Sequence, residues 1–197
     1  SQERRNKLGA SFMDLMFKEI FSWRLVQTDP HFGNYRIRIA KSSENDKVIL
    51  FDFGATRKFP KRYIDPFRKL VFSSLHLNKE ENIQAGIDLG FLRHDDSKEM
   101  CDLFNKICFT AIEGFGEKNQ SPGVDGQKTG KNPYLWGQTK LLERLALLGK
   151  DAVFTFKLRM PPPEAIFMDR KMVGTYTLVS QLKLKMGPRK LISKYVK

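Results

Sequence analysis

Three polar side chains near the start of the chain occur in an order that suits metal-assisted phosphate chemistry. Asp29 is followed five residues later by Asn34, and Asp52 begins an Asp-Phe-Gly triplet at the end of an apolar run. Carboxylate and amide oxygens are ligands that Mg²⁺ prefers, and phosphoryl transfer also needs an acid that orients the acceptor. The order therefore predicts Asn34 and Asp52 as metal ligands and Asp29 as the catalytic side chain.

Gly54 completes this candidate site. A glycine gives the backbone freedom where the chain leaves the strand after Asp52, and we expect Gly54, Asn34 and Asp52 to bind the nucleotide cofactor. A structural alternative exists for each residue: Asp29 before a proline is also typical of a turn, and Asp52 could simply cap the next segment.

A hairpin is the element that must bring these oxygens together. Apolar and basic side chains alternate at residues 35–39, as in a strand with one solvent-exposed face. Residues 47–51 form a short apolar strand, and the polar stretch between the two is a turn. If the hairpin folds back on itself, Asn34 at one end and Asp52 at the other become neighbours.

The remaining sequence predicts helices, so the expected fold class is mainly α with a small β-hairpin. Apolar residues at helical spacing predict a helix over 6–23, in which only Glu19 breaks the apolar stripe. We expect Trp23 and Phe53 to lie in the core. Further helices are predicted at 63–77, 79–90, 97–115, 134–148 and from 163 onward. Segment 117–133 is rich in Gly, Lys, Asn and Gln and predicts a mobile loop.

The net charge of +13 is unevenly distributed over the 197 residues. Residues 170–197 contain Lys and Arg but no Asp or Glu, and they supply more than half of the excess. This basic C-terminal tail favours a phosphate-rich partner, an anionic membrane surface or an acidic neighbouring domain. The alternative is a solvated helical face with a frayed end.

The two cysteines and the terminal segments exclude several classes of protein. Cys101 and Cys108 lie on one helix face, without the His or Cys neighbours of a metal site, and are expected to be core thiols. The uncharged stretch at 172–182 is far too short to span a membrane. The N-terminal ten residues are too charged for a signal peptide.

With these motifs in order, the chain resembles the C-terminal lobe of the UbiB/ADCK family of atypical protein-kinase-like proteins, which is associated with ubiquinone biosynthesis. The resemblance rests on QTDPHFGN at 27–34, LFDFGATR at 50–57, PPE at 162–164 and DRKMVG at 169–174. It covers nearly the whole chain. Phe32 stands where many members have Pro.

The resemblance implies an atypical kinase or ATPase that uses ATP and Mg²⁺. Asp29 takes the role of the catalytic-loop aspartate, while Asn34 and Asp52 take the metal-binding roles.

A kinase fold also has an N-terminal lobe with a phosphate-covering loop and a strand lysine, which nothing before the first predicted helix supplies. The expected architecture is a protein-kinase-like C-lobe with the N-lobe absent. Residues 1–60 form its catalytic-loop and triplet segment and 61–197 its helical part. ATP and the missing lobe or an upstream segment are the expected partners.

Two other functions are compatible with the same sequence. A non-catalytic module would bind an anionic membrane surface or an isoprenoid lipid through the basic tail, and nucleic acid is disfavoured because no nucleic-acid motif is present. An inactive chain would instead expose a concave, partly apolar face beside Asp29 and Asp52. The expected setting is the cytoplasmic face of a bacterial membrane or the mitochondrial matrix side, with the chain soluble or peripheral.

Overall fold

The computed structural model of the chain describes residues 1–116, 133–156, 159–187 and 189–196. Within these ranges the fold is mainly helical with two antiparallel sheets of two strands each, which confirms the expected class. The predicted mobile loop at 117–133 lies outside the described residues, except for Pro133. The elements are α1 (Gln2–Phe17), β1 (Leu25–Gln27), β2 (Tyr35–Arg38), β3 (Lys47–Leu50), β4 (Thr56–Lys58), α2 (Lys61–Leu75), α3 (Lys79–Leu89), α4 (Lys98–Ile112), α5 (Leu141–Thr155), α6 (Pro163–Gln181) and α7 (Arg189–Ile192).

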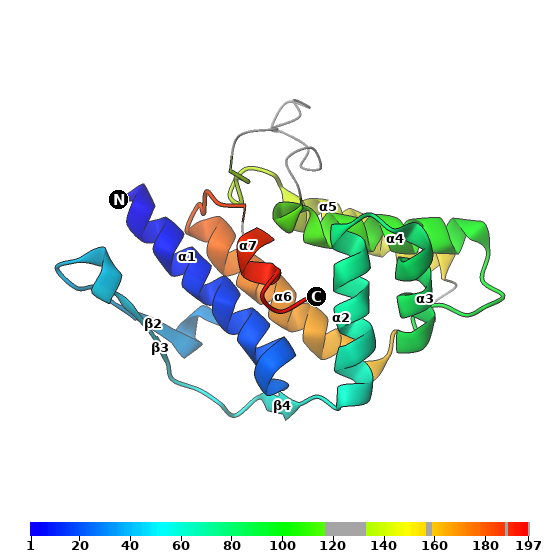
Figure 1. Cartoon of the computed structure of the whole chain (residues 1–197), viewed down its shortest axis with the longest axis horizontal. Coiled ribbons are helices and arrows are strands. Elements are labelled where there is room, and N and C mark those ends of the chain that lie inside the picture. Colours follow the sequence, from blue (N-terminus) through cyan, green and yellow to red (C-terminus); the bar gives the residue numbers. More distant parts are fainter. Residues whose placement is uncertain (117–132, 157–158, 188, 197) are drawn as a thin grey trace.

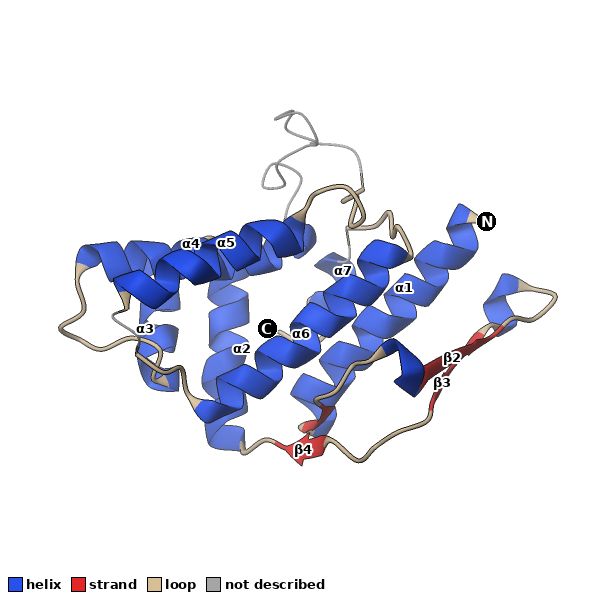
Figure 2. Cartoon of the chain, turned by 180° about the vertical axis from the view of Figure 1, so that it is seen from behind, coloured by secondary structure: helices blue, strands red, loops and turns tan. Residues whose placement is uncertain are grey.

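Two helices from opposite ends of the sequence form the centre of the molecule. Helices α1 and α6 lie side by side, and the short α7 packs on α1 (Figure 1). Helices α2, α3, α4 and α5 gather at one end of this pair, while the β2–β3 hairpin lies on the other side of α1, as Figure 2 shows from behind. The hairpin is therefore anchored on α1.

The predicted hairpin is confirmed, and a second strand pair was missed. In the hairpin, Tyr35 lies opposite Leu50 and Arg38 opposite Lys47. The second pair joins β1 to β4, with Leu25 opposite Lys58. Strands of three residues are too short to show a period of two, so the sequence pattern did not reveal this pair. The pairing of β1 with β4 holds together the two ends of the segment that contains the polar motifs.

The first predicted helix is present but changes its winding near its end. The α-helical part stops at Phe17, and residues Lys18–Trp23 continue as a π-helix that Arg24 ends with a left-handed φ of 54°. Trp23 is 56% exposed and Phe53 is 59% exposed, so their prediction as core residues was wrong. The wider π-helical turns change the direction of the last side chains and leave Trp23 outside the core.

Helix α5 begins at Leu141, later than the predicted start at 134. The preceding segment instead runs irregularly beside the end of α6, where Leu135 forms a β-bridge with Lys185. Tyr134 and Trp136 are both buried there, and the Trp136 ring meets Tyr176 with 5.2 Å between centroids. These two aromatic side chains therefore fill the core from a loop and not from a helix.

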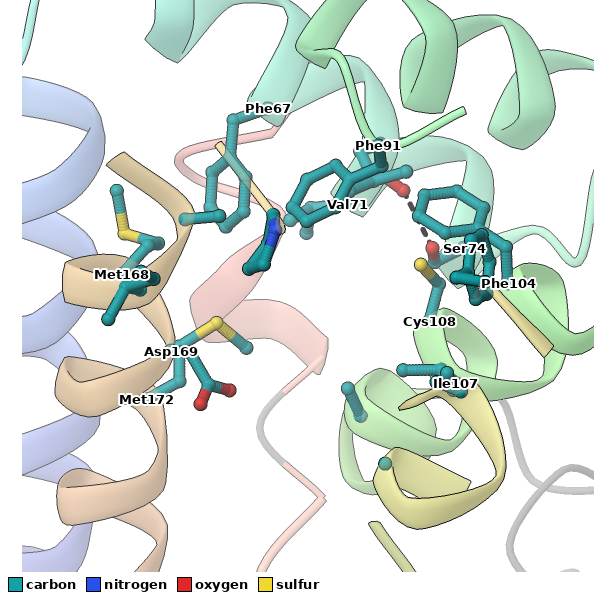
Figure 3. A pocket seen from close by; sticks show the side chains of 18 of the residues that line it. Phe67, Val71, Ser74, Phe91, Phe104, Ile107, Cys108, Met168, Asp169 and Met172 are labelled. Atoms are coloured by element: carbon teal, nitrogen blue, oxygen red, sulfur yellow. Dashed lines mark hydrogen bonds between the residues drawn. The ribbon is translucent and has the colours of Figure 1, made fainter. Parts of the chain in front are cut away.

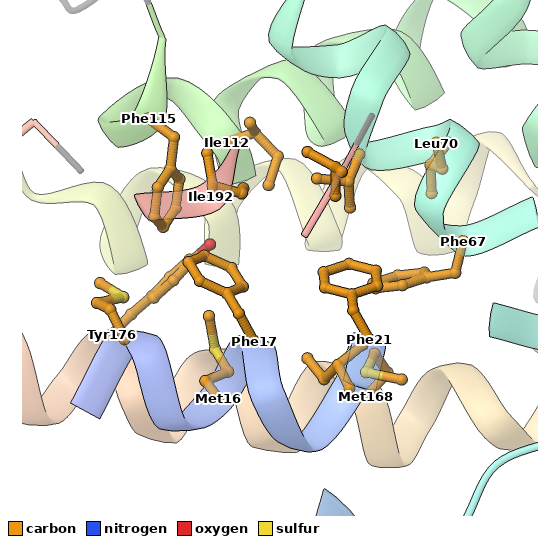
Figure 4. Packing of buried hydrophobic residues seen from close by; sticks show 14 of the residues in the cluster. Met16, Phe17, Phe21, Phe67, Leu70, Ile112, Phe115, Met168, Tyr176 and Ile192 are labelled. Atoms are coloured by element: carbon orange, nitrogen blue, oxygen red, sulfur yellow. The ribbon is translucent and has the colours of Figure 1, made fainter. Parts of the chain in front are cut away.

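The core lies between α1, α2, α4 and α6 and is rich in aromatic rings. Phe17 packs edge-on against Phe115, and Phe21 stacks on Phe67 with 6.0 Å between centroids (Figure 4). Ile192 and Val196 of the basic tail are also buried in this cluster. The tail is therefore docked on the core by its apolar side chains, and the frayed end considered from the sequence is not what the described residues show.

Candidate active site

A single glutamine joins the two polar motifs. The Asp29 N–H donates to Gln27 Oε1 at 2.8 Å, and Gln27 Nε2 donates to the Asp52 carbonyl oxygen at 3.4 Å. The Thr28 N–H and hydroxyl both donate to the Ala55 carbonyl oxygen, at 3.1 and 2.8 Å. The loop after β1 and the Asp-Phe-Gly triplet are thus held against each other along their backbones.

The open end of the hairpin brings Asn34 and Asp52 together. The Phe51 N–H donates to the Asn34 carbonyl oxygen at 3.0 Å, which extends the pairing of β2 with β3 to the residue before Asp52. Asn34 Nδ2 donates to the Asp29 carbonyl oxygen at 2.8 Å. All three predicted site residues therefore lie within one connected network.

The remaining oxygens of Asn34 and Asp52 suit a Mg²⁺ ion. The amide nitrogen of Asn34 is used by Asp29, which leaves Oδ1 as the oxygen that a cation can coordinate. Asp52 Oδ1 accepts the Gly54 N–H at 2.7 Å, which orients the carboxylate and leaves Oδ2 available. Mg²⁺ usually takes one or two protein oxygens and completes its shell with phosphates and water. No cluster of three His, Cys, Asp or Glu side chains suited to a metal occurs among the described residues.

Helix α6 forms one wall of this site, which the sequence pattern did not predict. Arg170 NH2 lies 3.2 Å from Asp29 Oδ1, in a half-exposed ion pair. One turn further along α6, a Cβ added to Gly174 would come within 2.1 Å of Pro30 Cγ. The helix and the loop touch so closely at this point that only a glycine fits.

A buried ion pair lies beneath the loop. Lys171 Nζ is 2.6 Å from Glu19 Oε2, and the two side chains are 2% and 6% exposed. The same Glu19 oxygen accepts the Gln27 N–H at 3.1 Å. Burial raises the pKa of the Glu19 carboxyl and lowers the pKa of the Lys171 ammonium, and each partner counteracts the shift of the other. The interruption of an apolar stripe by Glu19 was the one sequence signal that could have revealed this pair.

Apolar side chains flank the site on its solvent side. Phe32, Phe51 and Phe53 are all exposed, and they lie beside Asn34 and Asp52 in the chain. The side chains that adjoin the polar motifs in the chain are therefore apolar and exposed.

The basic tail is partly occupied by contacts within the chain. Arg170 pairs with Asp29, Lys171 is buried against Glu19, and Arg189 NH1 donates to the Leu75 carbonyl oxygen at 3.3 Å. The remaining described lysines of the tail are exposed, namely Lys183, Lys185, Lys190 and Lys194. Among the described residues of the tail, these four lysines are the exposed ones that form no ion pair.

Neither cysteine forms a disulfide. Burial raises the pKa of the Cys108 thiol to about 12, and it also raises the pKa of Cys101. A thiol with such a pKa is not a nucleophile at neutral pH. The cysteines are packing groups in this fold.

The connected aspartate and asparagine motifs lie on a largely helical scaffold. A family model described as the ABC1 atypical kinase-like domain matches residues 1–85, the part that contains all the predicted site residues.

Curated relatives extend the similarity over most of the chain. The mitochondrial atypical kinase coq-8 of Caenorhabditis elegans is 27% identical over 180 residues, or 91% of this chain and 22% of the relative. The mitochondrial atypical kinase COQ8 of Schizosaccharomyces pombe is 25% identical over 197 residues, or 100% of this chain and 30% of the relative. The mitochondrial atypical kinase COQ8B of Danio rerio is 25% identical over 190 residues, or 96% of this chain and 28% of the relative.

These matches confirm the resemblance to the UbiB/ADCK family of atypical protein-kinase-like proteins. The chain spans less than a third of the length of each of these three relatives. Across the described ranges, no helix combines the length and apolar character needed to cross a bilayer.

Proposed function

We propose that the chain forms the catalytic part of an ATP- and Mg²⁺-dependent atypical kinase or ATPase of the UbiB/ADCK type, linked to ubiquinone biosynthesis. The main support is the Gln27 side chain, which holds the loop of Asp29 against the triplet that begins with Asp52. Such a network would fix the position of Asp29, the acid that orients the acceptor, relative to the metal ligands Asn34 and Asp52. Phosphoryl transfer depends on this positioning.

Each polar side chain has a distinct role in this proposal. Asn34 Oδ1 and Asp52 Oδ2 hold the Mg²⁺ ion, and Gly54 keeps the Asp52 carboxylate oriented. The ion supplies the positive charge that neutralises the phosphates of ATP. Asp29 accepts a hydrogen bond from the attacking hydroxyl or water and so orients it, while Arg170 holds the Asp29 carboxylate in place.

The exposed phenylalanines beside the site suggest the partner in this proposal. Phe32, Phe51 and Phe53 form apolar surface next to the metal ligands, where an N-terminal lobe or upstream segment would cover the nucleotide. The three relatives are named as mitochondrial proteins, which favours the mitochondrial alternative for this chain.

The metal assignment is tested by thermal unfolding with ATP, in Mg²⁺ and in a chelator. A ligand at one hundred times its Kd stabilises the folded state by about 2.7 kcal/mol. We expect the Mg²⁺-dependent part of this stabilisation to disappear in Asp52→Asn, because the amide lacks the charge that the ion needs. Asp65→Asn is the matched control, since Asp65 is exposed on α2. Equal Mg²⁺-dependent stabilisation of Asp52→Asn and the parent chain would contradict the assignment.

A second candidate function is binding of an anionic membrane surface by the basic tail. The four exposed lysines support it, since no acidic residue lies between 170 and 197. Deletion of the tail would remove Ile192 and Val196 from the core, so charge removal is the better test. Replacement of Lys183, Lys185, Lys190 and Lys194 by Gln should abolish salt-sensitive binding to vesicles that contain phosphatidylserine, with Mg-ATP binding unchanged. Unchanged vesicle binding would reject this function.

A further inference from the structure

A cavity of about 460 Å³ lies between α2, α4, α5 and α6, away from the candidate active site. Its walls are almost entirely apolar and include Phe67 and Val71 from α2, Ile107 from α4, and Met168 and Met172 from α6. Figure 3 shows the α6 side chains facing those of α4 across the open space. The volume falls within the range of about 300–1,000 Å³ that is typical of small-molecule sites.

The cavity opens to solvent through an apolar mouth. Val153, Met160 and Ile166 line it and are also substantially exposed, at 46%, 76% and 42%. A Cβ added to Gly149, which lies on α5 and lines the cavity, would meet no atom within 4 Å. The space beside Gly149 is therefore open.

One carboxylate faces this apolar space. Asp169 lines the cavity and is itself exposed to solvent, and its side chain is directed toward the open space in Figure 3. Its carboxylate makes no ion pair or hydrogen bond with another described residue. Arg159 also lines the cavity, but its two terminal nitrogens bind Asp96, each at 2.7 Å. Desolvation by the walls raises the pKa of the Asp169 carboxyl.

A second polar group in the wall also lacks a partner. Tyr63 lines the cavity and is only 6% exposed, and its hydroxyl makes no hydrogen bond to any described residue. Buried hydroxyls are normally paired, so an unpaired one in a cavity wall indicates a place for a ligand or a water molecule. Asp169 and Tyr63 are thus two cavity-lining residues whose polar groups have no partner among the described residues.

We propose that this cavity binds an amphiphile whose apolar chain fills the space between the four helices and whose cationic, hydrogen-bond-donating head pairs with Asp169. The apolar walls bind the chain without regard to its head group. Asp169 then selects the head, because a cation pairs with its carboxylate, whereas an anion is repelled. This site is independent of the nucleotide chemistry proposed above.

The proposal is tested by displacement of the neutral fluorophore N-phenyl-1-naphthylamine from the purified chain. The competitors are dodecylamine, dodecanol and dodecanoate, each below its critical micelle concentration. They share one chain and differ only in the charge of the head. We expect dodecylamine to bind at least about tenfold more tightly than dodecanol, as an ion pair near a protein surface allows, and dodecanoate to bind most weakly.

Two variants distinguish the space that binds the apolar chain of the ligand from the side chain that binds its head group. Asp169→Asn should remove the preference for the amine over the alcohol while the alcohol still binds. Gly149→Phe should remove binding of all three competitors, because its ring occupies the open space beside α5. The matched controls are Asp151→Asn, an exposed acid on α5, and Gly149→Ala, which adds only one methyl group. Both should bind as the parent chain does.

Three results would overturn the proposal. If the parent chain binds none of the probes, or if Gly149→Phe binds them unchanged, the cavity is not the site. If Asp169→Asn keeps the full preference for dodecylamine, Asp169 does not select the head group. Circular dichroism of each variant confirms that it is folded.

Discussion

At the scale of single residues, the candidate site depends on a buried ion pair that is distant from it in the sequence. Lys171 neutralises Glu19, and Glu19 holds the Gln27 backbone, whose side chain in turn holds Asp29 and Asp52. Removing one member of a buried pair leaves the other charge uncompensated, whereas removing both leaves no buried charge. Removal of one partner is therefore expected to destabilise the fold more than removal of both partners.

This leads to a prediction on Lys171. Lys171→Met should lower the free energy of unfolding by about 3–5 kcal/mol, since Glu19 is left charged and buried. The double variant Glu19→Gln, Lys171→Met should lose less than Lys171→Met alone. Urea unfolding at pH 7 measures both. Lys140→Met is the control, because the exposed pair of Lys140 and Glu143 should contribute no more than about 1 kcal/mol. Equal losses in the single and double variants would show that the pair is not coupled.

At the scale of elements, α6 positions the loop that holds Asp29. The helix contributes Arg170 to the carboxylate of Asp29 and presents Gly174 directly to Pro30. A glycine inside a helix normally costs stability relative to alanine, so its presence here reflects the close approach of the two segments. The late DRKMVG motif at 169–174 is thus a structural support of the catalytic loop.

Gly174→Ala tests this support. The added methyl group would overlap Pro30 Cγ, so the loop must move, and we expect a loss of about 1–3 kcal/mol in stability together with weaker Mg²⁺-dependent stabilisation by ATP. Gly149→Ala provides the contrast, because a Cβ there meets nothing within 4 Å and should stabilise α5 by about 0.5–1 kcal/mol. Thermal unfolding with and without Mg-ATP measures both quantities. A neutral or stabilising effect of Gly174→Ala would contradict the close approach.

At the scale of the whole molecule, ion pairs join segments that lie far apart in the sequence. Asp96, in the connection between α3 and α4, binds Arg159, which precedes α6. The side-chain hydrogen bond from Arg159 lowers the pKa of the Asp96 carboxyl, and the Arg93 N–H contributes in the same direction. The four-helix end of the molecule is therefore linked to α6 by charge as well as by apolar packing.

This pair should give the fold a defined acid sensitivity. A carboxyl whose folded pKa is lowered stabilises the fold above its unfolded pKa, and this stability is lost as the pH falls through the folded value. Asp96→Asn should therefore be less stable than the parent chain at pH 7, and the difference should shrink as the pH falls below 3.8, the ordinary pKa of the group. Urea unfolding between pH 7 and pH 2.5 measures this. A difference independent of pH would reject the ion pair as its cause.

The sequence alone determined those features that depend on neighbouring residues. The hairpin followed from alternation at 35–39 and an apolar run at 47–51, and most helices followed from their apolar spacing. The order of Asp29, Asn34 and Asp52 indicated phosphate chemistry. These signals are local, because a strand or a helix repeats its own pattern over a few residues.

Only the tertiary structure decided what surrounds these residues. The pairing of β1 with β4, the exposed position of Trp23, and the contacts of Lys171 and Arg170 from α6 all join segments distant in sequence or depend on the winding of one turn. No periodic sequence pattern indicates these contacts. Their energy comes from desolvation and close packing, which exist only once α1 and α6 lie side by side. The same packing leaves the cavity beside Asp169, which no motif indicated.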